Sequence, residues 1–226
     1  MEDNPVRYAP LRVKVWGDLA CFSRPEMKVE RVSYEVMTPS AARGILESIF
    51  WKPEMEWEIR AIQLLRPVRF HGFVRNEVNV KANPATALRR DQQDKRGKGI
   101  FINDRDIRTQ RHTLALRDVA YIIVADVHVM EGIDADPAKY RDQFRRRVQR
   151  GQCYSMPYLG CREFSASFSE PTDLDQPLPI TADLGRMLLD LVYEPGESGR
   201  GTPLFFEARL EQGSMHIPPQ MYERRG

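Results

Sequence analysis

A basic, amphipathic stretch from Pro137 to Arg150 constrains this chain more than any other part of its sequence. Its large apolar residues recur at every fourth position, which predicts a helix with one buried stripe. They are Tyr140, Phe144 and Val148. Asp136 is a suitable N-cap, proline suits the first helical turn, and Gly151 suits the position just after the helix ends. We therefore expect a capped helix over this stretch.

The remaining faces of this predicted helix are strongly basic. Its cations are Lys139, Arg141, Arg145, Arg146, Arg147 and Arg150. They are opposed by Asp136 and Asp142, so the helix carries more positive charge than solubility requires. The simplest partner for such a surface is a polyanion, with phosphate as the charged group. The alternative is a basic face that contacts solvent alone.

Charge is unevenly distributed along the rest of the chain. The 226 residues carry a net charge of +2, but residues 81–117 hold ten Lys or Arg against four Asp. Residues 163–198 hold eight Asp or Glu against one Arg. A basic middle and an acidic end indicate that one side of the protein meets nucleic acid and another side does not.

Cysteine and histidine usage argues against disulfides and against a structural zinc site. Cys21, Cys153 and Cys161 are odd in number, far apart and outside any CxxC pair, and the four histidines are scattered. We expect neither a metal ion nor another cofactor. The first ten residues lack the apolar core of a signal peptide, and the aliphatic run at 121–125 is too short to span a membrane. A cytoplasmic protein without a membrane partner is expected.

The spacing of apolar residues predicts a second helix and several strands. Thr38-Pro39 is a strong helix start, and Lys52-Pro53 is a helix end, because the residue before proline is pushed out of the helical region. The predicted strands are residues 11–16, 57–65, 68–73, 119–130, 163–168, 187–193 and 204–210. Large apolar residues are few between residues 75 and 117, so this segment is expected to project as a basic arm.

The order of these elements predicts an α+β fold. Strand, helix, strand, long insertion, strand, helix and strand follow the split βαβ, or ferredoxin-like (RRM-like), pattern. We therefore expect a ferredoxin-like domain over residues 1–170, with its basic arm at about 75–117. Residues 171–226 are expected to form a small C-terminal antiparallel sheet.

Three blocks of the sequence resemble a known family. They are VWGDLACFSRPEMKVERVSYEVMTPSAARGILESIFWKP at 15–53, RNEVNVKANPATA at 75–87 and AKYRDQFRRRVQRGQCYSMPYLGCREF at 138–164. They resemble the fifth CRISPR-associated (Cas) protein family in its subtype I-C form, part of the RAMP superfamily. A weaker match, at 184–194 and 202–213, extends the resemblance to the C-terminal strands.

This resemblance implies an RNA-binding protein with a ferredoxin-like domain and a small C-terminal sheet. Subtype I-C members cut precursor CRISPR RNA at the base of the repeat hairpin without a metal ion. They then stay on the 5′ handle of the guide RNA in the surveillance complex. The implied partners are repeat-derived CRISPR RNA and the backbone and large subunits of that complex.

The resemblance also places the family's catalytic residues on Phe50, Lys139 and Tyr140. Phe50 stands where relatives carry Tyr or His, and Tyr140 stands where His is expected, so the lysine alone is kept. Metal-free cleavage needs a base for the 2′-hydroxyl, a cation for the phosphate and an acid for the leaving oxygen. The alternative interpretation makes Phe50 and Tyr140 core residues and Lys139 a surface lysine. His71 and Tyr34 are substitute candidates for the chemistry.

Cations outside the catalytic positions are predicted to bind phosphates. They are Arg145, Arg146 and Arg150 on the basic helix and Arg89, Arg90, Lys95, Arg96, Lys98, Arg108 and Arg111 on the arm. Trp16, beside Arg12 and Lys14 on one strand face, is predicted to stack on an unpaired base. Burial of Trp16 under a helix is the alternative.

The leading hypothesis is a subtype I-C subunit that binds the repeat hairpin, cleaves it and caps the 5′ handle. A second hypothesis is a non-catalytic assembly subunit, in which Phe50 and Tyr140 record the loss of the nuclease. A third is a protein that mainly binds duplex DNA through the arm. The first two hypotheses differ in whether the side chains beside Lys139 can catalyse cleavage. The third is distinguished by whether the protein prefers duplex DNA or repeat RNA.

Overall fold

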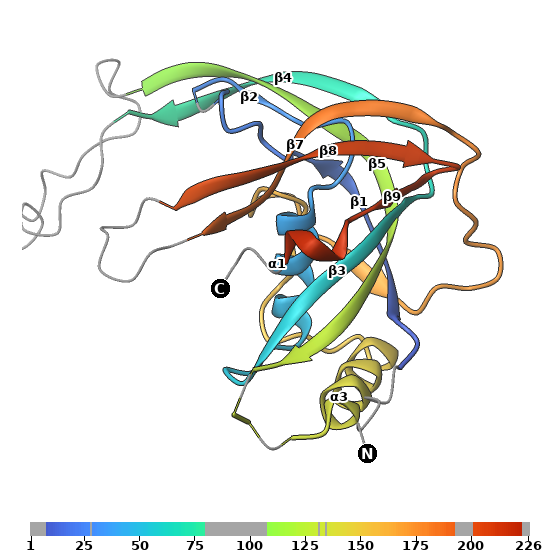
Figure 1. Cartoon of the computed structure of the whole chain (residues 1–226). Coiled ribbons are helices and arrows are strands. Elements are labelled where there is room, and N and C mark those ends of the chain that lie inside the picture. The colour runs from blue at the N-terminus through green and yellow to red at the C-terminus, as the bar shows by residue number, and fades with distance from the viewer. Residues whose placement is uncertain are drawn as a thin grey trace, which may run out of the picture.

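The computed structural model describes residues 8–27, 29–79, 108–130, 132–133, 135–192 and 201–222. It is an α+β structure in which a curled, mostly antiparallel sheet wraps around one helix (Figure 1). The strands are β1 Leu11–Ala20, β2 Arg31–Val32, β3 Met55–Leu64, β4 Phe70–Val78, β5 Arg108–Val129, β6 Ser167–Ser169, β7 Ala182–Val192, β8 Thr202–Glu211 and β9 Ser214–His216. The helices are α1 Pro39–Ile49, α3 Pro137–Gln149 and the short 3-10 helix η1 Pro219–Met221. None of the described helices is long and apolar enough to cross a membrane.

The strands of the described residues form one sheet in the order β6-β1-β5-β3-β9-β8-β7, with β2 and β4 also paired to β5. β1 and β3 lie antiparallel to β5, and β6 lies antiparallel to β1. The C-terminal strands are antiparallel, as expected. They continue the main sheet through the pairing of β9 with β3, however, and do not form a separate sheet. The domain division at residue 170 stays a prediction.

Both predicted helices begin where their N-capping residues stand, but α1 ends at Ile49, three residues before the predicted end at Lys52-Pro53. The Thr38 hydroxyl accepts a hydrogen bond from the backbone N–H of Ala41 at 3.3 Å, and the Asp136 carboxylate accepts one from Ala138 at 2.8 Å. These side chains satisfy donors that the first helical turn leaves unpaired. Gly151 follows α3 with a φ of +62°, a backbone conformation that glycine adopts without strain.

The core lies between the sheet and the two helices. Alternation along β1 buries Leu11, Val13 and Val15 on one face, as the sequence pattern predicts. The apolar stripe of α1 packs against β3 and β7, and Trp57 of β3 meets Phe144 of α3 with ring centroids 4.7 Å apart. Burial of each large side chain of this kind contributes roughly 1.5–3 kcal/mol to folding.

The predicted long insertion differs from the structure at both ends. Residues 75–78 belong to β4, and residues 108–117 are the first half of β5, so the two strands form a ribbon. A two-stranded ribbon is held by main-chain hydrogen bonds, and exposed polar side chains along it hide the pattern of a strand. The 22-residue β5 carries Asp118 at a φ of +55°, between the ribbon and the core half of the strand.

The strand predicted at 163–168 is shorter and later than expected. The structure has β6 at Ser167–Ser169, and residues 157–166 form a tight loop before it. In this loop the backbone N–H of Leu159 donates to the carbonyl of Phe164 at 2.7 Å. Phe164 and Ala166 are buried as the alternation predicts, but loop geometry rather than a strand places them.

Candidate nucleic-acid interface

Helix α3 and its C-cap present four exposed cations. They are Lys139, Arg145, Arg146 and Arg150. Arg145 forms an exposed ion pair with Asp142 at 3.3 Å, of a kind that contributes little because solvent screens it. Within the described part of the chain, no acidic side chain pairs with Lys139, Arg146 or Arg150. These side chains are available for an anionic partner.

The two other cations of α3 are used inside the protein. Arg141 is 3% exposed; its guanidinium donates to the carbonyl of Ala9 and lies 3.8 Å from the Asp126 carboxylate. Arg147 donates to the carbonyl of Ile49 at 2.6 Å and so ties α3 to the last turn of α1. The basic surface of the helix is therefore narrower than its composition suggests.

Tyr140 lies beside Lys139 but is almost completely buried, with 2% of its surface exposed. Its hydroxyl donates a hydrogen bond to the Glu54 carboxylate at 3.2 Å, and the Lys139 ammonium lies 5.6 Å from the ring centroid. Burial, and then the hydrogen bond to Glu54, raise the pKa of Tyr140 above its ordinary value. The phenol is therefore neutral at physiological pH and is a proton donor rather than a base.

Phe50 closes α1 and is 1% exposed. Its carbonyl accepts a hydrogen bond from the Trp57 indole at 2.9 Å, and the Arg147 guanidinium lies 5.3 Å from its ring centroid. Arg147 is seven residues after Tyr140, a separation of about 10 Å along a helix axis. The structure thus places Lys139 and Tyr140 together near the start of α3 and Phe50 near its end. The burial of both aromatic residues agrees with the core alternative for them.

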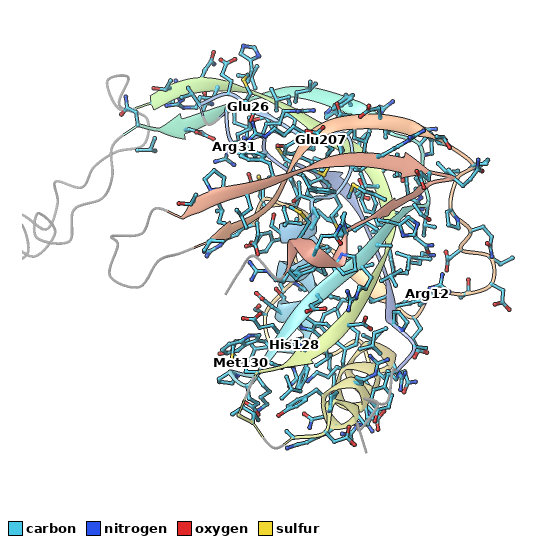
Figure 2. The ribbon with its side chains drawn as sticks, viewed as in Figure 1. Arg12, Glu26, Arg31, His128, Met130 and Glu207 are labelled. Carbon is cyan, nitrogen blue, oxygen red and sulfur yellow. The ribbon has the colours of Figure 1, made fainter. Side chains whose placement is uncertain are left out.

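Of the two predicted phosphate-binding cations on the ribbon, Arg108 has no acidic partner among the described residues, and Arg111 is engaged. Arg108 is exposed at the start of β5, whereas Arg111 lies 3.3 Å from Glu77 and donates to the carbonyl of Val29 at 3.3 Å. Arg31, which lies beside the ribbon in Figure 2, pairs with the same Glu77 at 3.6 Å. The predicted phosphate contacts at Arg89, Arg90, Lys95, Arg96 and Lys98 lie outside the described residues.

Trp16 is half-buried, so part of its ring is accessible. The ammonium of Lys14 lies 5.5 Å from its ring centroid and 2.5 Å from the carboxylate of Asp175. Arg12, labelled in Figure 2, donates to the side chain of Gln63 at 3.2 Å. Lys14 is therefore partly neutralised, and this face is less basic than the sequence alone indicates.

A groove of about 860 Å³ opens where the end of α1 meets α3 and the 154–162 loop, and we did not predict it from the sequence. Its lining includes aromatic and basic side chains that are distant in sequence. They are Trp51, Lys52, Arg147, Tyr154, Tyr158 and Arg162. All of them belong to the first and third blocks that carry the family resemblance. That shared membership was the signal in the sequence, but it did not indicate that the two blocks meet in space.

Comparison with known proteins supports the resemblance. The family model described as CRISPR-associated protein (Cas_Cas5) matches residues 10–222. A protein of Thermus thermophilus named CRISPR pre-crRNA endoribonuclease Cas5d is 45% identical over 231 aligned residues, covering 95% of this chain and 94% of that protein. A protein of the same name from Mannheimia succiniciproducens is 43% identical over 222 residues, covering 92% of this chain and 95% of that protein.

Solved structures share the fold. A functionally uncharacterized protein from Streptococcus mutans superposes with a TM-score of 0.66 at 20% identity, covering 96% of both chains. A crystal structure titled CRISPR-associated protein superposes with a TM-score of 0.64 at 20% identity, covering 95% of this chain and 96% of that one. The family model matches almost the whole sequence, and both named relatives are 43–45% identical to it. This chain belongs to the Cas5d family of CRISPR-associated proteins.

Proposed function

We propose that this protein is a pre-crRNA endoribonuclease that binds the repeat hairpin, cleaves it without a metal ion and stays on the 5′ handle of the product. The observation that carries the proposal is its 43–45% identity, over 92–95% of the chain, to two proteins named CRISPR pre-crRNA endoribonuclease. Other subunits of a subtype I-C surveillance complex are its proposed protein partners.

The exposed cations of α3 support RNA binding. Lys139, Arg146 and Arg150 have no acidic partner among the described residues, so their charges are available to phosphates. Contacts of this kind are independent of sequence and fix the register of the RNA on the protein. Arg145 adds a fourth cation once its exposed pair with Asp142 opens.

The chemistry of the proposed cleavage centres on Lys139. An exposed ammonium at this position stabilises the charge that develops on the phosphate as the neighbouring 2′-hydroxyl attacks. Attack forms a bond between the 2′-oxygen and phosphorus and breaks the bond to the 5′-oxygen, leaving a 2′,3′-cyclic phosphate. In this proposal the proton of the attacking 2′-hydroxyl passes to solvent water, and the departing 5′-oxygen takes a proton from the neutral Tyr140 phenol, which first releases its hydrogen bond to Glu54 and is later reprotonated by water.

We also infer a ferredoxin-like arrangement for the N-terminal part of the sheet. The order β6-β1-β5-β3 is antiparallel throughout, with α1 between β1 and β3 and α3 between β5 and β6. This connectivity supports the split βαβ pattern. It also explains how α3 comes to lie directly beside the end of α1.

One observation favours a second candidate function, a non-catalytic RNA-binding subunit. The side chains at two of the three family catalytic positions, Phe50 and Tyr140, are almost wholly buried. In that case RNA binding through α3 remains, and another enzyme processes the RNA.

A single assay separates the two candidates. A repeat hairpin labelled at its 5′ end is incubated with purified protein in excess chelator, and the products are resolved and treated to open cyclic phosphates. The proposed endoribonuclease yields one cut at the hairpin base with a cyclic end, and Lys139→Ala abolishes the cut. Tight binding without any cleavage, at enzyme excess and long times, selects the non-catalytic subunit.

A further inference from the structure

Strand β4 has one edge that the described sheet leaves unpaired. All nine of its residues pair with β5 in an antiparallel register without a shift. Among the described residues, β5 is the only strand that pairs with β4, so the main-chain groups on its other edge have no strand partner there. β4 runs beside β5 along the top of the molecule in Figure 1. A regular edge of this length is a template to which another strand can add.

The features that usually protect an edge strand are absent from β4. Natural proteins block edge pairing with proline, with lysine or with bulges that twist the strand. The β4 sequence, FHGFVRNEV, contains no proline and no lysine, and its pairing with β5 is free of bulges. β7, at the end of the sheet order, differs because its register with β8 shifts twice and Gly185 in it has a φ of +66°. β4 is therefore the better suited of these two edges for pairing with another strand.

Both charged side chains of β4 are compensated within the chain. Arg75 pairs with Glu163. Glu77 lies 3.5 Å from Arg75 and 3.3 Å from Arg111 of β5. These charges share one face of the strand, because side chains alternate between its two faces. The other face carries no charged residue of β4, and its members are Phe70, Gly72, Val74, Asn76 and Val78. A second strand therefore meets little electrostatic repulsion along this edge.

The uncharged face of β4 exposes large apolar side chains to solvent. Phe70, Val74 and Val78 each have 43–50% of their surface exposed. Leu114 of β5 lies opposite Gly72 on the same face and is 38% exposed. A row of exposed apolar side chains marks a surface that contacts another protein. The chemistry of this face therefore favours a protein partner over a nucleic acid.

The sequence of β4 is complementary to itself when two copies pair antiparallel about Val74. In this register Val74 faces Val74 of the second copy, and Phe70 faces Val78. Gly72 faces Asn76 and leaves room for its amide. Aromatic and β-branched side chains directly opposite each other are a favourable cross-strand combination. On the exposed face, apolar side chains therefore meet apolar side chains.

The other face of β4 is complementary in the same register. His71 comes to lie opposite Glu77, and Phe73 opposite Arg75. Within one chain the Arg75 guanidinium already lies 5.8 Å from the ring centroid of Phe73, so this ring accepts a cation. Moving the axis to Arg75 would place two guanidinium groups opposite each other, and moving it to Phe73 would place Arg75 opposite His71. Both alternatives are less favourable, so the side chains select the axis at Val74.

We propose that two copies of this protein form a dimer by antiparallel pairing of their β4 strands about a two-fold axis at Val74. The two ribbons of β4 and β5 then form one four-stranded sheet, joined by main-chain hydrogen bonds. Because each copy contributes its β4 edge to the axis, association ends at the dimer. Pairing of nine residues gives a small interface, so the dimer is weak and forms as the protein concentration rises. This association needs none of the residues proposed for RNA cleavage.

Sedimentation equilibrium tests the dimer over about 1–200 μM protein, the range in which weak interfaces assemble. The mass of the unmodified protein should rise from the 26.2 kDa of the monomer towards twice that value. Val74→Lys and Val74→Glu each place like charges opposite each other at the axis, so each variant alone should stay monomeric. An equimolar mixture of the two variants should recover the dimer, because a lysine then faces a glutamate. Leu174→Lys, at a 93% exposed position outside β4, is the control and should dimerise normally.

A cross-linking experiment tests the register of the two strands. Exposed Cys153 is first replaced by serine, which leaves the two buried cysteines. In that background Val74→Cys places two thiols opposite each other at the axis, and oxidised glutathione should convert them to a disulfide between the two copies. Asn76→Cys, on the same exposed face, comes opposite a glycine and is the matched control, so it should cross-link much more slowly. Equal rates at both positions would overturn the proposed pairing.

A protein that stays monomeric at every concentration would overturn the dimer. A dimer that Val74→Lys leaves intact, with an unchanged circular dichroism spectrum, would also overturn it, since the contact would then lie elsewhere. If the free protein is monomeric and Val74→Lys prevents its association with other subunits of the surveillance complex, the edge binds those subunits and not a second copy. Hairpin cleavage by a monomeric protein would leave the proposed function standing, and a dimer that binds the hairpin without cutting it would leave the pairing of β4 standing.

Discussion

The hydroxyl of Tyr140 donates to the carboxylate of Glu54 at 3.2 Å, which fixes the phenol at the position where an imidazole is expected in this family. Glu54 lies in the turn between α1 and β3, and Tyr140 belongs to the first turn of α3, so this contact joins the start of α3 to that turn. The Glu54 carboxylate can accept a hydrogen bond from any side chain at position 140 that carries an O–H or N–H group. The contact therefore predicts how substitutions at this position change the reaction.

Replacing Tyr140 with histidine is expected to accelerate hairpin cleavage. The imidazole would use Glu54 as its acceptor, and general acid–base catalysis by a positioned side chain contributes typically 10² to 10⁴-fold. Between pH 5 and 8 the rate of the unmodified protein should show no ionisation of Tyr140, because the pKa of that phenol is raised. The rate of the Tyr140→His variant should in addition depend on an ionisation near the ordinary histidine pKa of about 6.5. Single-turnover rates against pH test this, with Tyr140→Phe as control; superimposable profiles for all three proteins would contradict it.

Lys139→Ala is expected to abolish cleavage while leaving most of the affinity for the hairpin. Its ammonium acts on charge that develops in the transition state, whereas Arg146 and Arg150 still hold ground-state phosphates. Lys139→Arg keeps the charge and should retain part of the rate. Binding measured by anisotropy and cleavage measured by gel under the same conditions separate the two effects. An unaffected rate in Lys139→Ala would move the chemistry elsewhere, with His71 and Tyr34 as the next candidates.

Removal of the exposed arginines of α3 should weaken RNA binding and reduce its dependence on salt. For Arg145, Arg146 and Arg150 replaced together by Ala, each lost phosphate contact lowers the slope of log K against log salt by roughly 0.7–0.9. A matched triple variant removes Arg66 and Arg69, which are exposed between β3 and β4, and Arg209, which is exposed on β8. Equal slopes for the two triple variants would show that net charge, rather than the surface of α3, governs binding.

Gly44→Ala is expected to stabilise the protein by up to about 1 kcal/mol, because glycine inside a helix costs about that much relative to alanine. A Cβ at Gly44 meets nothing within 4 Å. Gly160→Ala is the contrasting variant, since its φ is +83° and its Cβ would collide with the Cys21 backbone, so strong destabilisation is expected. Urea unfolding measures both. Destabilisation by Gly44→Ala would reveal a steric contact in the native protein that the structure does not contain.

Alkaline pH is expected to destabilise the fold through its buried phenols. Burial raises the pKa of Tyr121 far above its ordinary value and also raises that of Tyr34. Above about pH 10 the unfolded chain releases these protons more readily than the folded protein does. Their contribution is therefore fully present below pH 10 and is lost as the pH rises beyond it. Tyr121→Phe keeps the edge contact of this ring with Phe22 and should flatten the loss, measured as urea midpoints from pH 8 to 11.

The parts of the fold that depend on local sequence were predictable. Thr38 and Asp136 cap the two helices, and the four-residue spacing of Tyr140, Phe144 and Val148 gives the buried stripe of α3, as predicted. Capping and periodicity act within one or two turns, so a single sequence contains the whole cause. The α+β class and the order of the main strands follow from the same local signals.

Features that depend on contacts between distant segments were not predictable. Nothing in the neighbourhood of Arg141 indicates burial, which results from the carbonyl of Ala9 and the carboxylate of Asp126. The pairing of β9 with β3 likewise joins residues more than 150 positions apart. The groove combines Trp51 with Tyr154 only because the loop after α3 hydrogen-bonds to Ser48. Each of these features depends on which distant segments meet in the folded protein, and the spacing of residues along the sequence does not contain that information.

The pairing of β3 has a consequence for how the protein is made in the cell. One edge of β3 is covered by β5, but residues 61–63 on its other edge pair with residues 214–216, more than 150 positions later in the chain. Until residues 214–216 have left the ribosome, that edge presents unpaired backbone groups that attract other strands. Contacts of such high sequence separation also form slowly. The yield of native protein therefore depends on how well the nascent chain is protected from aggregation before β9 is made.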